Sequence, residues 1–111
     1  MASEYTYKFT ERAEQDFDEI LNYITEELKN PDVAIKLGRK IFENIETICA
    51  YPETGMLVDN EYLSDKQVRR ILVDNYIVYY KPIATDETVY ILRIVYGYRN
   101  LDASVRTIDQ K

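Results

Sequence analysis

Hydrophobic and polar residues alternate or recur at regular spacing along the first half of the chain. Tyr5 to Phe9 alternates aromatic and polar side chains, which predicts a short strand. Thr10 follows as a candidate N-cap of a helix. The next apolar residues come at steps of three and four, which predicts an amphipathic helix with one buried stripe made of Ala13, Phe17, Ile20, Leu21, Ile24 and Leu28.

A second helix is predicted between two prolines. Asn30 ends the first helix and caps the second, Pro31 occupies its first position, and the helix ends before Pro52. Its apolar face comprises Val33, Ala34, Leu37, Ile41, Ile45 and Ile48, with Phe42 and Cys49 beside it. Because the connection between the helices is very short, we expect them to form an antiparallel hairpin.

Three β-rich runs follow an irregular polar segment that ends near Gln67. Residues 68–73 and 76–81 are joined by Asp74-Asn75, which is typical of a tight hairpin, and Pro82 is expected to end the second run. The longest strand is predicted at 88–96. The predicted fold is therefore a single α+β domain over residues 1–111, in the order β-α-α-β-β-β. In it, an antiparallel sheet is covered on one face by the antiparallel helical hairpin.

Composition and charge narrow the chemistry. The chain has 111 residues, a formal charge of −6, no histidine and one cysteine, Cys49. Histidine-based catalysis is excluded, and we expect neither a metal site nor a cofactor. Without a visible signal peptide or an apolar run long enough to cross a membrane, we expect a cytoplasmic protein. Carboxylates such as Asp16 and Asp18 are expected on a solvated helix face, and Cys49 in the core.

The C-terminal strands carry the residues with most chemical interest. Arg69 and Arg70 are neighbours and must point to opposite faces, while both parities of 88–96 are largely apolar, so pattern alone does not orient Arg93. These arginines either pair with carboxylates on a solvated face or, with Arg99, bind phosphate or an acidic partner. Most strand tyrosines are expected to pack across the sheet, and an exposed subset would stack on bases or anchor a partner.

Several segments resemble the RelE/ParE superfamily of bacterial toxin–antitoxin modules. They are E-R-A-E-Q-D-F-D-E-I, N-P-D-V-A-I-K-L, Y-P-E-T-G, V-R-R-I-L-V-D-N-Y-I-V-Y-Y and V-Y-I-L-R-I-V-Y-G-Y-R-N, in that order. The resemblance implies a small toxin neutralised by a cognate antitoxin that wraps around it. RelE-like members cleave mRNA on the ribosome with basic residues and often a C-terminal tyrosine. ParE-like members share the fold and poison DNA gyrase.

The resemblance also assigns candidate residues. For a ribonuclease they would be Arg69, Arg70, Arg99 and Tyr98, but Ile77 stands where RelE-like toxins carry an arginine, and A-S-V-R-T-I replaces the C-terminal tyrosine. Arg93 and Tyr96 are the expected partner-binding residues. We therefore expect a ParE-like toxin that acts by protein contact on gyrase. The alternatives are a ribosome-dependent endoribonuclease and a non-toxic partner-binding module.

Overall fold

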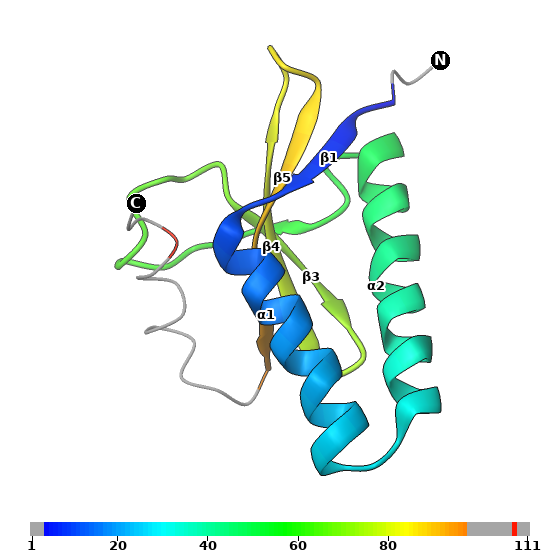
Figure 1. The fold of residues 1–111 in the computed structure, drawn as a ribbon. Coiled ribbons are helices and arrows are strands. Elements are labelled where there is room, and N and C mark those ends of the chain that lie inside the picture. Colours follow the sequence, from blue (N-terminus) through cyan, green and yellow to red (C-terminus); the bar gives the residue numbers. More distant parts are fainter. Residues whose placement is uncertain (1–3, 98–107, 109–111) are drawn as a thin grey trace.

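Two helices pack on one face of a five-stranded sheet in the computed structural model, which describes residues 4–97 and residue 108 (Figure 1). The elements in chain order are β1 (Thr6–Phe9), α1 (Glu11–Asn22), a π-helical turn η1 (Tyr23–Glu27), α2 (Pro31–Ala50), β2 (Met56–Leu57), β3 (Arg69–Val73), β4 (Tyr76–Ile83) and β5 (Thr88–Tyr96). The α+β class and the order of the predicted elements are confirmed. The two-residue strand β2 is an addition within the segment expected to be irregular.

The sheet is mixed rather than purely antiparallel. Its strand order is β1-β5-β4-β3-β2, and β1 runs parallel to β5, from Thr6 opposite Thr88 to Phe9 opposite Ile91. The expectation of a fully antiparallel sheet is wrong at this one pairing. The two hairpin-connected pairs, β3–β4 and β4–β5, are antiparallel as expected, and the additional strand β2 also runs antiparallel to β3. The direction of β1 follows from α1, which begins directly after it and lies along the C-terminal half of β5, so β1 must run the same way as β5.

The helix caps agree with the sequence pattern. The Thr10 hydroxyl accepts a hydrogen bond from the Ala13 N–H at 3.1 Å, and the Asn30 side chain accepts one from the Val33 N–H at 3.4 Å. The two helices form the expected antiparallel hairpin (Figure 1). No helix in the described part of the chain is long and apolar enough to span a membrane.

The end of the first helix departs from its predicted stripe. The Leu28 N–H bonds to the Tyr23 carbonyl at 3.2 Å, a five-residue step in place of the usual four, and Lys29 has a φ of 51°. The wider π turn inserts about one extra residue and shifts the helix phase. Ile24 therefore stays in the core while Leu28, predicted to be buried, is 57% exposed.

Both faces of the sheet carry apolar clusters. The larger lies under the helices and contains Ile41, Ile45 and Cys49 with Val78 and Ile91 of the sheet. Cys49 is buried as predicted, and this burial raises the pKa of its thiol. The smaller cluster lies on the opposite face, which the segment 58–68 covers. Val58, Leu63 and Val68 of this segment pack with Ile77, Tyr79 and Val95 of the sheet.

β4 continues through the proline that was expected to end it. Pro82 pairs with Val89 of β5 within the strand. On the other side, β3 pairs with β4 only as far as Arg69 opposite Tyr80. At Pro82 the strand β4 therefore pairs only with β5. Among the described residues, no strand lies on the other side to accept a hydrogen bond from an N–H at this position, so the proline breaks no pairing there.

The exit from α2 is held against the sheet by Tyr80. Its buried hydroxyl donates to the Pro52 carbonyl at 2.9 Å and accepts from the Gly55 N–H at 2.8 Å. A Cβ at Gly55 would lie 2.6 Å from both the Arg70 carbonyl oxygen and the Tyr80 hydroxyl. Glycine is therefore required at Gly55 by close approach of the backbone.

We predict that Gly55→Ala destabilises the protein by about 1–3 kcal/mol, since the added methyl group must displace backbone or the Tyr80 ring. Gly38→Ala, within α2, is the matched control, because its Cβ would meet only side-chain atoms of Phe17 and Leu21 on α1, at 3.6 Å or beyond. That change should raise stability by roughly 0.5–1 kcal/mol through helix propensity. Urea unfolding of both variants measures the difference, and equal effects would contradict the close approach at Gly55.

Candidate functional site

The C-terminal half of β5 lies beside α1 rather than beside another strand. β1 pairs with β5 only as far as Ile91, after which the chain turns into α1. The Thr10 hydroxyl donates to the Leu92 carbonyl at 3.1 Å while it caps the helix. One side chain thus starts α1 and attaches it to the edge of β5.

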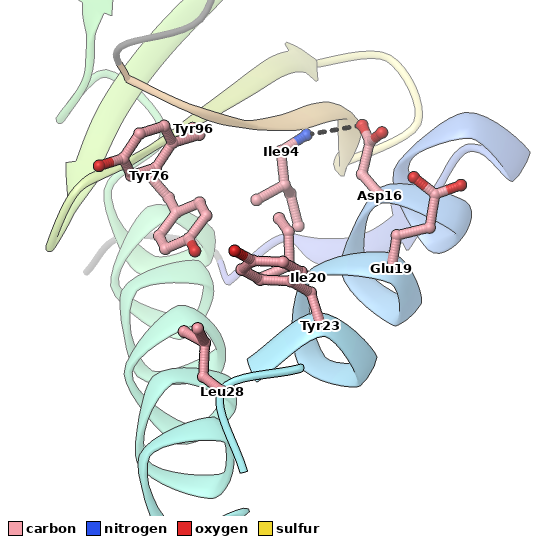
Figure 2. A pocket seen from close by; sticks show the side chains of 8 residues that line it. All are labelled: Asp16, Glu19, Ile20, Tyr23, Leu28, Tyr76, Ile94 and Tyr96. Atoms are coloured by element: carbon pink, nitrogen blue, oxygen red, sulfur yellow. Dashed lines mark hydrogen bonds between the residues drawn. The ribbon is translucent and has the colours of Figure 1, made fainter. Parts of the chain in front are cut away.

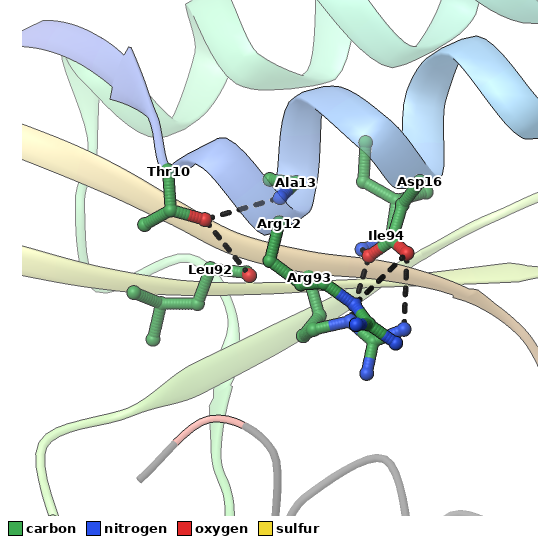
Figure 3. Close-up of polar contacts among 7 residues, drawn as sticks. All are labelled: Thr10, Arg12, Ala13, Asp16, Leu92, Arg93 and Ile94. Atoms are coloured by element: carbon green, nitrogen blue, oxygen red, sulfur yellow. Dashed lines mark hydrogen bonds and ion pairs between the residues drawn. The ribbon is translucent and has the colours of Figure 1, made fainter. Parts of the chain in front are cut away.

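A buried ion pair makes the second attachment (Figure 3). The Asp16 carboxylate accepts hydrogen bonds from the Ile94 backbone N–H at 3.0 Å, from Arg93 Nε at 2.7 Å and from Arg93 Nη2 at 3.0 Å. Asp16 and Arg93 are only 5% and 2% exposed, and Arg12 lies at the surface with its Nε 3.8 Å from Asp16. The expectation that Asp16 belongs to a solvated face is wrong.

Arg93, which we expected to contact a partner, is buried inside the protein. A buried guanidinium needs a counterion, and Asp16 supplies it in a bidentate geometry. Arg93 therefore offers almost no surface to another protein, and its charge joins β5 to α1. Tyr96, the other expected partner-binding residue, is exposed at the end of the same strand.

Arg69 also supports the fold. Its cross-strand neighbour is Tyr80, on the helix side of the sheet, and its Nη1 donates to the Gly55 carbonyl at 2.7 Å and the Glu53 carbonyl at 3.4 Å. Burial raises the pKa of Tyr80 by more than the bond from Gly55 and the charge of Arg69 lower it, so the pKa is raised overall. Arg69 and Tyr80 together fix the segment that follows α2.

Arg70 points to the face of the sheet opposite to that of Arg69, as expected for consecutive residues in a strand. It pairs across the strands with Tyr79, a member of the cluster on the face away from the helices, and it is half-buried. The described residues thus separate Arg69 from Arg70 rather than bring them together. Arg99 and Tyr98, the other two candidates for a ribonuclease site, lie outside the described residues.

The face that Arg70 shares is partly closed by an ion pair. Lys81 of β4 donates to the Asp65 carboxylate in the covering segment. Burial raises the pKa of Asp65, but the bonds from Lys81 and the Gln67 N–H outweigh it, so the pKa is lowered overall. Within the described part of the chain, no three histidine, cysteine or carboxylate side chains converge on a position that could hold a metal ion.

An apolar groove opens where α1 and η1 face the end of β5 (Figure 2). Its volume is about 690 Å³, and it is lined by Asp16, Glu19, Ile20, Tyr23, Leu28, Tyr76, Ile94 and Tyr96. The rings of Tyr76 and Tyr96 meet edge to face at 5.5 Å. Burial, and then the neighbouring phenols Tyr96 and Tyr23, raise the pKa of Tyr76.

A second hollow adjoins the groove across Leu28 and Tyr76, which line both. It lies between α2 and the β3–β4 turn, with Val33 and Lys36 on its wall, and Lys40 bonded to Asp74 at 3.1 Å. The sequence did not predict this region, because Leu28 comes to the surface through the π turn and no residue pattern indicated that turn. The exposed tyrosines and Leu28 make the groove suited to apolar side chains of another protein.

Comparison with known families places this fold. The family model described as the ParE toxin of the type II toxin–antitoxin system parDE matches residues 7–101. The chain belongs to the ParE toxin family. The matched residues cover every described helix and almost every strand residue, including Asp16, Arg93 and the groove. No curated protein sequence matches this ParE-family chain.

Solved structures agree on the fold. A chromosomal ParDE toxin–antitoxin system from P. aeruginosa matches with a TM-score of 0.65 and 21% identity, over 83% of this chain and 95% of that one. The RelBE2 toxin–antitoxin complex from Mycobacterium tuberculosis matches with a TM-score of 0.59 and 19% identity, over 85% and 99%. A mutant of the E. coli toxin RelE in the free state matches with a TM-score of 0.59 and 17% identity, over 98% and 100%.

We predict that Asp16→Asn lowers the free energy of unfolding by about 3–5 kcal/mol, because Arg93 stays buried without its counterion. Asp18→Asn is the control on the exposed side of the same helix, with an expected change within about 0.5 kcal/mol. The double variant Asp16→Asn/Arg93→Met should be more stable than Asp16→Asn alone, since it also removes the buried guanidinium that has lost its counterion, while the asparagine oxygen accepts from Ile94 in both. Urea unfolding tests all three, and equal losses for Asp16→Asn and Asp18→Asn would refute a structural ion pair.

Proposed function

We propose that this chain inhibits bacterial growth by binding DNA gyrase, in the manner that ParE membership implies, and that a cognate antitoxin neutralises it. The observation that carries the proposal is that two strand arginines, Arg69 and Arg93, are bonded to groups inside the protein. Arg93 is paired with Asp16 inside the protein, and Arg69 is bonded to loop carbonyls. Neither guanidinium is free to serve as a catalytic cation.

Cleavage of RNA needs cations close to the phosphate that gains charge in the transition state. The net charge of −6 opposes that requirement, because an acidic protein attracts a polyanion only through a local cluster of cations. A protein target needs no such cluster. Contact with gyrase therefore fits the charge distribution better than catalysis on mRNA.

The antitoxin is proposed to occupy the groove between α1 and β5. Leu28, Tyr23 and Tyr96 are all exposed there. Buried tyrosines are common sources of binding energy between proteins, and Leu28 adds apolar area that a partner can cover. The adjoining hollow extends the same surface along α2. A segment that covers both would bury the apolar side chains that the π turn exposes.

A ribosome-dependent endoribonuclease is the second candidate function. It is favoured by Arg70, which is half-buried on the face away from the helices and is not bound to a carboxylate among the described residues. In that function Arg70 would act with Arg99 and Tyr98, as the RelE resemblance implies.

Induced expression in bacteria separates these functions, with growth, mRNA integrity and the DNA-damage response measured together. We expect growth arrest with a DNA-damage response and intact mRNA, and we expect the double variant Arg70→Ala/Arg99→Ala to arrest growth equally. Codon-positioned mRNA cuts that the double variant abolishes would establish the ribonuclease instead. Normal growth with folded, abundant protein would leave a non-toxic partner-binding module.

The antitoxin groove is tested by Leu28→Asp, in binding assays with the protein encoded by the neighbouring reading frame. A charge placed where an apolar side chain is buried should weaken binding about tenfold to a hundredfold. Ile35→Asp is the matched control, since Ile35 on α2 is 60% exposed, close to the 57% of Leu28, but lines neither hollow. Equal affinities for the two variants would place the antitoxin elsewhere.

A further inference from the structure

Four aromatic rings gather at the other end of the helical hairpin, where β1 meets both helices. Tyr7 and Phe9 come from β1, Phe17 from α1 and Phe42 from α2. The ring centroids of Phe17 and Phe42 are 5.4 Å apart, and Phe9 lies 5.9 Å from Phe17 and 6.0 Å from Phe42. These three rings join the two helices to the edge of the sheet.

Tyr7 extends this cluster to the surface. Its ring lies 6.1 Å from that of Phe42 at an angle of 54°, and the two residues are 41% and 36% exposed. A hollow of about 390 Å³ opens beside them. Packing of the helices accounts for the inner rings, but it does not require a tyrosine and a phenylalanine to remain open to solvent.

The charges around the hollow are mainly negative. Glu14 and Asp18 line it from α1, one helical turn apart on the side of Phe17, and Lys8 lines it from β1. Neither carboxylate forms an ion pair with a described cation. Two carboxylates and one ammonium leave the lining with a net charge of −1.

We propose that this hollow binds an arginine side chain from a basic segment of a partner protein. A guanidinium can lie against aromatic rings and bond to carboxylates in the same pose, which suits the combination of Tyr7 and Phe42 with Glu14 and Asp18. The carboxylates repel phosphate, so stacked nucleic acid is the less suitable occupant. The site shares no residue with the groove assigned to the antitoxin.

The probe is a blocked Gly-Arg-Arg-Gly peptide, and the matched control is the same peptide with citrulline, which keeps the shape but removes the charge. Aromatic NMR signals of Tyr7 and Phe42 should shift saturably with the arginine peptide. Binding of the citrulline peptide should be at least about fivefold weaker, given the usual strength of a cation–π contact and its accompanying ion pair. Equal binding of the two peptides, or no saturable shift, overturns the proposal.

Variants locate the contact. Phe42→Leu removes one open ring, and Glu14→Gln/Asp18→Asn removes both charges from exposed positions without touching the core. Each should weaken the arginine peptide at least about fivefold. Tyr51→Leu changes an exposed ring outside the hollow and should leave binding unchanged. If Phe42→Leu unfolds, the charge variant decides alone, and unchanged affinity in it refutes the site.

Discussion

The Asp16 carboxylate makes the contact on which the arrangement of this protein depends. β5 extends beyond its pairing with β1, so its C-terminal half has a free edge that must be satisfied. Asp16 receives the Ile94 N–H from that edge and the guanidinium of Arg93 from the same strand. A helix takes the place of a strand there, and a single carboxylate substitutes for part of the ladder.

This contact fixes how α1 is rotated about its axis, and its rotation creates both surface features. With Asp16 turned into the edge of β5, Ile20 and Tyr23 come to line the apolar groove at one end. Glu14 and Asp18 turn towards the aromatic hollow at the other end. The two surfaces lie on one helix but draw on different faces of it and share no lining residue.

Local patterns predicted what local physics determines. Thr10 and Asn30 cap their helices as expected, and the range 88–96 matches β5, because capping and β-propensity act within a few residues. The pair Asp16–Arg93 spans 77 residues, and both parities of β5 were apolar, so no local signal related them. The predictions that Pro82 ends its strand and that Leu28 is buried were wrong for a similar reason. The unpaired edge of β4 depends on neighbours distant in sequence, and the π turn depends on backbone geometry.

The buried pair also determines what the surface presents to other molecules. Asp16 and Arg93 cancel each other, so the formal charge of −6 falls entirely on the remaining residues, while one arginine of the C-terminal strands is removed from the surface. Such a surface suits recognition through apolar contact or through cations that the partner brings. A groove lined by tyrosines and Leu28 offers the first, and a hollow that combines rings with carboxylates offers the second. An arginine in the last strand is thus evidence of how the sheet is anchored before it is evidence of chemistry on a phosphate.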